Sequence, residues 1–165
     1  MNYSENRLWS DRFIPDIKKI IGPLLLGEST FEVDTKEATD LVIMHTRDLH
    51  IAARVRRYGF SDKYPFDFTI RSRSKNGQKT ELSKIVDGMA DWMFYGHADF
   101  NNKSISRWMV LNLDSFRAAL IRKQVNIPRE IPNSDGTKFV TFDVRKFPEN
   151  LIIACCDDFF SDKAA

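Results

Sequence analysis

The segment PFDFTIRSRS, residues 65–74, restricts the possible folds because its apolar and polar residues alternate. Successive side chains of an extended strand point to opposite faces, so this alternation predicts a strand with one face in a core. The apolar face would carry Phe66, Phe68 and Ile70. The polar face would carry Asp67, Thr69, Arg71 and Arg73.

The chain on either side of this strand predicts further elements. Downstream, Asn76-Gly77 marks a turn, and Thr80 can cap a short helix that begins at Glu81. Upstream, residues 40–44 and 50–57 have the composition of two strands separated by HTRD, which predicts a β-hairpin.

Helices and strands are also expected over the rest of the chain. Ser10 can cap a helix over residues 11–21, and Asp114 or Ser115 can cap a helix that ends near Lys123. Further strands are expected at residues 91–98, 105–113, 137–144 and 150–156. The expected order, αβββαββαββ, gives a mixed β-sheet flanked by helices, in the α/β or α+β class, and residues 1–165 would form a single domain.

Cations are concentrated in the central part of the sequence. The chain of 165 residues carries a net charge of +2, but residues 47–84 contain ten Lys/Arg against four Asp/Glu. Residues 1–46 contain five Lys/Arg against eight Asp/Glu. Such a block is typical of a surface that binds a polyanion, although charges along a solvated sheet edge would give the same block.

Several classes of protein are not indicated. No apolar run approaches about 18 residues, and the N-terminal segment lacks the apolar core of a signal peptide, so we expect a cytoplasmic protein without a membrane span. The two cysteines are adjacent, at 155 and 156, which suits neither a disulfide framework nor a zinc site. Walker A, GxGxxG, HExxH and GxSxG motifs are absent from the sequence.

Three carboxylates in or beside the basic block are candidate ligands for a divalent metal: Asp40, Asp67 and Glu81. Mg²⁺ held by such carboxylates, with Lys84 stabilising the developing charge, would support phosphodiester cleavage. Each residue also has an ordinary structural explanation. Asp40 can be a turn residue, and Asp67 can pair with Arg71. Glu81 can complement the helix dipole, and Lys84 can be its i,i+3 partner.

The stretch TDLVIMHTRDLHIAARVRR resembles the PD-(D/E)XK nuclease superfamily, and the order of elements over about residues 10–115 resembles it as well. In that superfamily a helix precedes a hairpin, one strand opens with Asp, the next carries an acid, any residue and a lysine, and a helix follows. The resemblance places Asp40 as the first acid. At the acid-x-lysine position, however, this chain has Ala52-Ala53-Arg54.

Two other registers of the same motif are open. One uses Asp67 as the second acid, with Thr69 in place of the lysine. The other uses Glu81 with Lys84 on the following helix. The resemblance implies a Mg²⁺-dependent nuclease with a central sheet.

The arginines of the basic block are the strongest candidates for contacts to nucleic acid. Alternation puts Arg54 and Arg56 on one face of their strand, and Arg71 and Arg73 on one face of theirs. If the two faces coincide, four guanidinium groups meet, and paired guanidinium groups match phosphate geometry. The expected nucleic-acid-binding residues are Arg54, Arg56, Arg57, Arg71, Arg73 and Lys75.

A second group of residues follows the basic block. His97, after Phe94-Tyr95-Gly96, could line a pocket. Trp92, Tyr95 and Trp108 could stack on bases, although aromatic residues that alternate along strands more often form a core.

These observations lead to two main hypotheses, and a third class, a structural or assembly protein that associates through its aromatic strands, is also open. The first is a small nucleic-acid-processing protein of bacterial or phage type, a Mg²⁺-dependent phosphodiesterase. Its catalytic residues would be Asp67, Glu81 and Lys84, and its metal ligands Asp40, Asp67 and Glu81. The second is a non-enzymatic nucleic-acid-binding module, or a phage-type inhibitor that presents its basic face to a host nuclease or defence complex.

Overall fold

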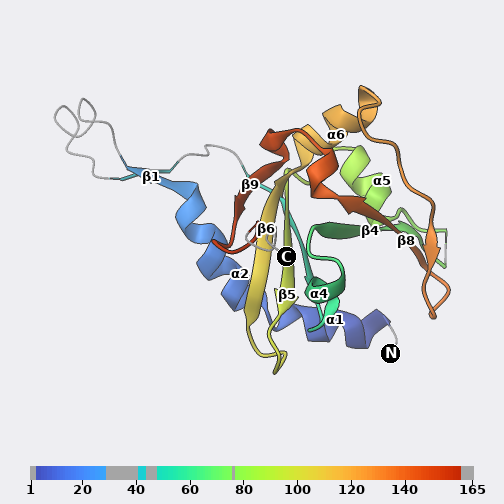
Figure 1. The fold of residues 1–165 in the computed structure, drawn as a ribbon, viewed down its shortest axis with the longest axis horizontal. Coiled ribbons are helices and arrows are strands. Elements are labelled where there is room, and N and C mark those ends of the chain that lie inside the picture. Colours follow the sequence, from blue (N-terminus) through green and yellow to red (C-terminus); the bar gives the residue numbers. More distant parts are fainter. Residues whose placement is uncertain (1–2, 29–40, 44–47, 76, 161–165) are drawn as a thin grey trace.

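The computed structural model describes residues 3–28, 41–43, 48–75 and 77–160 (Figure 1). Its described part contains five α-helices, a four-stranded sheet and a three-stranded sheet. The expected class, mixed α/β, is therefore confirmed, and apart from the short pair β1–β2 the described strands are divided between these two sheets.

The four-stranded sheet is mixed. Its order is β3-β5-β6-β9, formed by β3 (Ile51–Arg56), β5 (Trp92–Ala98), β6 (Ile105–Asn112) and β9 (Ile152–Cys155). The pair β3–β5 is parallel, and the pairs β5–β6 and β6–β9 are antiparallel. Since β3 pairs in parallel, the chain between β3 and β5 must cross over, and it does so through β4 and α5.

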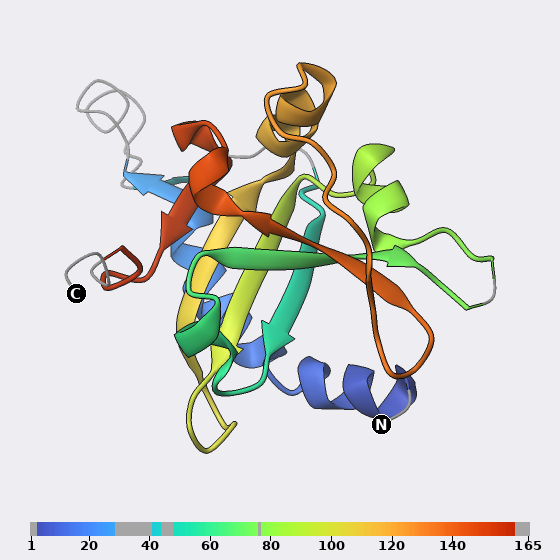
Figure 2. The same ribbon diagram turned by 45° about the vertical axis from the view of Figure 1, so that its right-hand side comes forward.

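The three-stranded sheet is antiparallel and has the order β4-β8-β7. It consists of β4 (Asp67–Arg73), β8 (Lys138–Asp143) and β7 (Ile131–Pro132). In Figure 2, β4 and β8 cross in front of the four-stranded sheet at a steep angle. The two sheets therefore face each other as crossed layers.

The main core lies between these layers. On β5, Met93 and Tyr95 point into it, and on β4 Phe68 and Ile70 do so. Phe68 is completely buried, and its ring stacks on Phe142 of β8 with the ring centroids 5.4 Å apart. The predicted apolar face of residues 65–74 is thus confirmed, because Phe66, Phe68 and Ile70 are all buried.

A second, smaller core covers the opposite face of the four-stranded sheet. Helix α2 (Ile14–Ile21) lies there, with α1 (Tyr3–Asp11) before it in the chain. The buried residues of this core on the helical side are Phe13, Ile17 and Ile21. Those on the strands are Val55, Trp92, Phe94, Ala98 and Val110. A short 3₁₀ turn, Gly22–Leu25, follows α2 and leads to β1 (Leu26–Glu28), which pairs with β2 (Leu41–Ile43).

Three further helices lie near the three-stranded sheet. They are α4 (Phe60–Lys63), α5 (Glu81–Val86) and α6 (Leu113–Ile121). The Thr80 hydroxyl accepts a hydrogen bond from the Ser83 amide at 3.2 Å, which confirms the predicted cap of α5. Two 3₁₀ turns, Val144–Lys146 and Glu149–Leu151, connect β8 to β9.

The predicted hairpin over residues 40–57 is wrong. The strand β2 pairs with β1, whereas β3 pairs with β5, so the two predicted arms belong to different sheets. A parallel partner more than thirty residues away leaves no local signal, and the turn-like composition of HTRD favoured the nearer pairing.

Two predicted helix starts also differ from the structure. Ser10 lies inside α1, and the second helix begins at Ile14 because Pro15 suits only the first turn of a helix. Asn112 caps α6 in place of Asp114 or Ser115, since its side-chain oxygen accepts hydrogen bonds from both of their amides. Among the described helices, none combines the length and the apolar character that a membrane crossing requires.

The contact between the sheets can be tested with two matched phenylalanine substitutions. We expect Phe68→Ala to lower the free energy of unfolding by about 3–5 kcal/mol, because it leaves a cavity between the layers. Phe100→Ala, in the turn after β5 where the side chain is 74% exposed, should change it by less than about 1 kcal/mol. Urea unfolding of both variants measures the difference, and equal losses would contradict the assigned core.

Candidate nucleic-acid interface

An ion pair between Arg54 and Glu81 lies at the centre of the candidate interface. The Arg54 guanidinium donates to the Glu81 carboxylate, and both side chains are only about one-fifth exposed. The same carboxylate oxygen accepts a hydrogen bond from the Arg71 backbone amide at 2.9 Å. The pair therefore joins β3, β4 and the first residue of α5.

The polar contacts continue from this pair into the space between the sheets. Arg54 Nη1 lies 3.5 Å from Thr69 Oγ1, and that oxygen lies 3.2 Å from the Tyr95 hydroxyl. Thr69 and Tyr95 are both buried. Buried hydroxyl groups require hydrogen-bond partners, and here the Thr69 and Tyr95 hydroxyl groups are partners of each other.

Two hollows flank the ion pair. One has a volume of about 620 Å³ and is lined by α5, by the chain leading into it and by the end of β4. The other, of about 490 Å³, is lined by α1, β3 and the start of α4. Arg71 lines both hollows, so they meet at this residue, and we call the two together the basic groove.

Cations outnumber carboxylates along the basic groove by eight to three. The first hollow presents Arg71, Lys75, Lys79 and Lys84. The second adds Arg7, Arg54, Arg56 and Arg57. The carboxylates are Asp11, Glu81 and Asp135. A hollow with this excess of positive charge concentrates the field and attracts polyanions.

Aromatic rings order two of the groove's guanidinium groups. The Arg56 guanidinium lies 4.3 Å from the centroid of the Phe60 ring, and that of Arg57 lies 4.4 Å from the centroid of Trp9. Burial, as the largest cause, lowers the pKa of Arg56 below its usual value. A cation that has lost part of its hydration gains more from a bound anion than a solvated one does.

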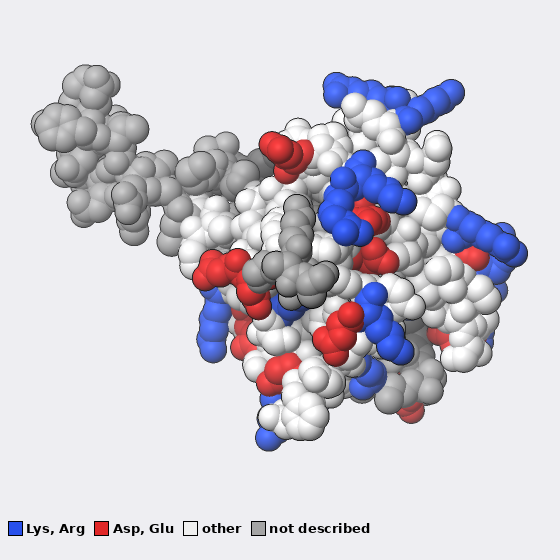
Figure 3. Space-filling model, in the orientation of Figure 1, with Lys and Arg blue, Asp and Glu red and all other residues white. Residues whose placement is uncertain are grey.

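The structure brings together most of the expected binding residues, but not Arg73. Arg54, Arg56, Arg57, Arg71 and Lys75 all line the groove. Arg73 lines neither hollow and instead pairs with Glu130 at 3.2 Å. Over the face shown in Figure 3, positive and negative side chains are intermingled, so an excess of cations is not a general feature of this surface.

The expected metal and catalytic residues are divided between two places. Glu81 and Lys84 line the first hollow of the groove, whereas Asp67 lines a separate cavity between the sheets. Asp40 lies outside the described residues. Within the described part of the chain, no group of three or more His, Cys, Asp or Glu side chains is arranged to hold a metal ion. Since Asp67 and Glu81 line different cavities and Asp40 is not described, the expected Mg²⁺ site stays a prediction from the sequence.

Asp67 lies in a half-buried position opposite another carboxylate. Its register partner on β8 is Asp143, which Arg145 binds through a contact of 2.7 Å. Burial, followed by the charge of Asp143, raises the pKa of Asp67 above its usual value. The side chain of Asp67 points to the opposite face of β4 from Phe66 and Phe68, so an acid is accommodated between these two buried rings.

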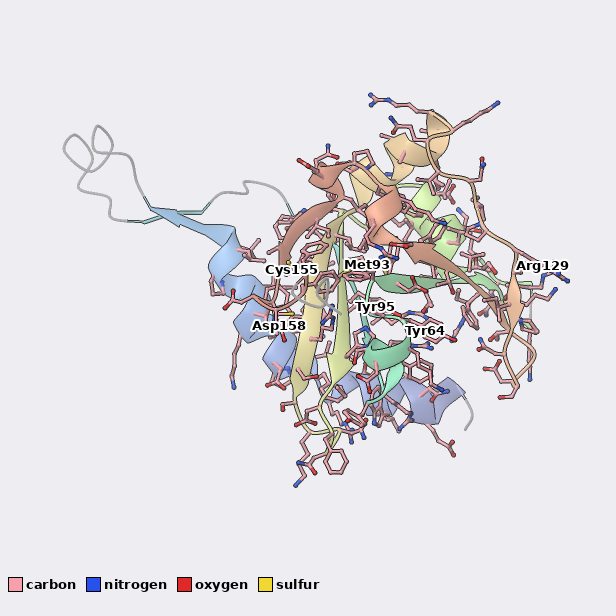
Figure 4. The ribbon with its side chains drawn as sticks, viewed as in Figure 1. Tyr64, Met93, Tyr95, Arg129, Cys155 and Asp158 are labelled. Carbon is pink, nitrogen blue, oxygen red and sulfur yellow. The ribbon has the colours of Figure 1, made fainter. Side chains whose placement is uncertain are left out.

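The cavity that contains Asp67 also contains His97, and we call it the inter-sheet pocket. Its volume is about 420 Å³. Its polar residues are Arg56, Asp67, Thr69, Tyr95, His97 and Thr141. Its apolar and aromatic residues are Phe60, Tyr64, Ile131 and Phe139. In Figure 4, Tyr64 lies beside Tyr95, below the level at which β4 crosses β5.

His97 is buried and neutral in this pocket. Its side chain is only 3% exposed, and its Nδ1 atom has no hydrogen-bond partner in the described structure. Burial, with smaller contributions from Arg56 and Arg107, lowers the pKa of His97 to about 4. The expectation that His97 lines a pocket agrees with its position.

Sequence reasoning missed the contribution of the N-terminal helix. Arg7 and Trp9 lie on α1, which was not predicted. Because the first helix was expected to begin after Ser10, neither residue was assigned to a helix or to a binding surface. Lys79 belongs to the central cationic block, which is the one signal that pointed to it.

The buried histidine makes stability depend on pH. The pKa of His97 falls from 6.5 to about 4 on folding, so the unfolded chain binds a proton more readily between these values. We expect the free energy of unfolding to decrease as the pH falls from 6.5 to 4, by up to about 3 kcal/mol for this residue. Urea unfolding at stepped pH measures the slope. His97→Gln should reduce it and His50→Gln, an exposed control, should not; equal slopes in all three proteins would contradict the assignment.

No protein-family model, curated protein or solved structure matches this chain. The resemblance to the PD-(D/E)XK superfamily thus stays a prediction from the sequence. The function must be argued from the geometry of the basic groove.

Proposed function

We propose that the protein binds single-stranded nucleic acid, with the sugar-phosphate backbone along the basic groove. The observation that carries this proposal is that eight cations and only three carboxylates line the two hollows, which meet at Arg71. Backbone phosphates supply most of the affinity in non-specific nucleic-acid binding, and Lys and Arg are the residues that neutralise them.

The order of the cations supports phosphate as the ligand. Arg56 and Arg57 are each stacked on an aromatic ring, so less side-chain entropy is lost when their guanidinium groups bind an anion. Glu81 neutralises Arg54 and holds it against β4, which gives the groove a fixed wall.

The size of the groove favours one strand over a duplex. Hollows of about 490 and 620 Å³ have the volume of small-molecule sites. They accommodate a few nucleotides of a single chain. Trp9 and Phe60 line the second hollow, and aromatic side chains among cations are typical of single-strand binding surfaces.

Cleavage of the bound strand is a second candidate function. It is favoured by one observation, that Glu81 and Lys84 line the same hollow as the proposed phosphate-binding cations. A carboxylate and a lysine beside a phosphodiester are groups that such chemistry uses. Glu81, however, already accepts hydrogen bonds from Arg54 and Arg71, so binding is the function that the geometry supports better.

Binding is tested by titrating fluorescently labelled single strands of DNA and RNA at several salt concentrations. We expect the affinity to fall steeply with salt, because bound phosphates release counterions. The double variant Lys75→Ala, Lys84→Ala removes two groove cations and should reduce the slope of log K against log salt by about 1.4.

A matched control carries the same change of charge elsewhere. Lys18→Ala, Lys19→Ala removes two exposed lysines of α2, which do not line the groove, and should leave the slope nearly unchanged. No binding at low salt, or equal losses in the two double variants, would overturn the proposal.

The same samples test cleavage. Shortened strands that appear with wild-type protein in the presence of Mg²⁺ or Mn²⁺, and that do not appear with Glu81→Gln, would establish the second candidate. If the strands stay intact under all these conditions and binding is retained, the protein binds the strand without cleaving it.

A further inference from the structure

The inter-sheet pocket and the basic groove share two wall residues. Arg56 and Phe60 line the second hollow of the groove and also line the pocket. The Arg56 guanidinium lies over the Phe60 ring, at the boundary between the two spaces. A nucleotide whose phosphate binds Arg56 from the groove would therefore have its base next to the pocket.

The lining of the pocket has the two properties that a nucleobase requires. Its aromatic and apolar walls, Phe60, Tyr64, Ile131 and Phe139, provide surfaces for a flat ring. Its hydroxyl and carboxyl groups, on Thr69, Thr141 and Asp67, can exchange hydrogen bonds with the polar edge of that ring. Its volume of about 420 Å³ lies within the range of sites for small organic molecules.

His97 adds a buried polar group to the wall of this pocket. Its side chain is 97% buried, yet its Nδ1 atom has no hydrogen-bond partner among the described residues. A buried polar atom without a partner is unfavourable. The Nδ1 atom is itself covered from solvent, so a ligand would hydrogen-bond to it, and remove that penalty, only after the ring turns toward the pocket. The neutral imidazole can present either a donor or an acceptor at this atom, as base edges also do.

The charges of the pocket favour a base over a phosphate. Among the described residues that line it, Arg56 is the one cationic side chain, and Asp67 places a carboxyl group in the same space. A negatively charged phosphate would lie close to that carboxyl group and be repelled by it. An exocyclic amino group of a base would instead donate a hydrogen bond to it. The phosphate thus belongs on the groove side of Arg56 and the ring on the pocket side.

We propose that the inter-sheet pocket receives one base of the strand bound in the basic groove, with His97, Asp67 and the Thr69 and Thr141 hydroxyls at its polar edge. The inference rests on the proposed single-strand binding and adds a site for an unstacked base. Such a site allows a protein to read or select a nucleotide after turning it out of the strand.

The test combines a change in the ligand with a change in the protein. The probes are a single strand of about ten deoxynucleotides and a strand of the same length made of abasic units, which keeps every phosphate. Ile131→Trp, at a pocket wall that is 44% exposed, fills the space with an indole ring. Ile127→Trp, 53% exposed in the segment between α6 and β7 and outside the pocket, is the matched control.

We expect the normal strand to bind the wild-type protein about tenfold more tightly than the abasic strand, since each stacked base contributes on this scale. The ratio of the affinity for the normal strand to that for the abasic strand should fall severalfold in Ile131→Trp and stay unchanged in Ile127→Trp. In proton–carbon NMR spectra, adenosine and cytidine should shift the His97 ring signals saturably, and ribose 5-phosphate should not.

The outcomes separate the two proposals. If the abasic strand fails to bind at low salt, the groove proposal fails, and this inference falls with it. If both strands bind but the ratio is one, or is equal in the two tryptophan variants, the pocket inference is overturned while the groove proposal stands. Shifts of His97 by ribose 5-phosphate instead of nucleosides would likewise overturn it by showing an anion site.

Discussion

The ion pair of Arg54 and Glu81 is the contact on which the arrangement of the groove depends. It connects an edge strand of one sheet to the helix that follows the edge strand of the other, and the Arg71 amide completes it from β4. Both charges are largely removed from water, so each needs the other. Loss of either partner would leave an uncompensated charge at the place where the two hollows meet.

The crossed packing of the sheets explains why polar groups gather beside the core. Strand β5 sends Trp92 and Phe94 toward α2 and sends Met93, Tyr95 and His97 toward the second sheet. The main core, to which Met93 belongs, contains six buried phenylalanine side chains. Toward His97 the apolar filling gives way to hydroxyl, carboxyl and imidazole groups. The pocket thus marks the end of the main core, where polar side chains share the space between the sheets with Ile131 and Phe139.

Local patterns predicted individual elements better than they predicted partners. Alternation in residues 65–74 correctly predicted the buried face of β4, and Thr80 caps α5 as expected. Alternation also predicted that Arg54 and Arg56 share a face, and both line the second hollow. The partner of β3 was not predictable, because nothing in residues 50–57 indicates whether a strand pairs with its neighbour or with one after a crossover. Arg73 lies on the expected strand, yet Glu130 from a distant loop determines its contact.

The smaller core has a consequence for how the chain folds during synthesis. The apolar face of α2, formed by Ile17 and Ile21, is covered by residues that come from β3, β5 and β6. Its most distant partner, Val110, follows Ile17 by more than ninety positions. A ribosome adds residues one at a time, so the helix emerges long before the strands that shield it. This pairing of an early helix with late strands makes docking of α2 a late step, and its apolar stripe is open to chaperones or to aggregation until β6 has been made.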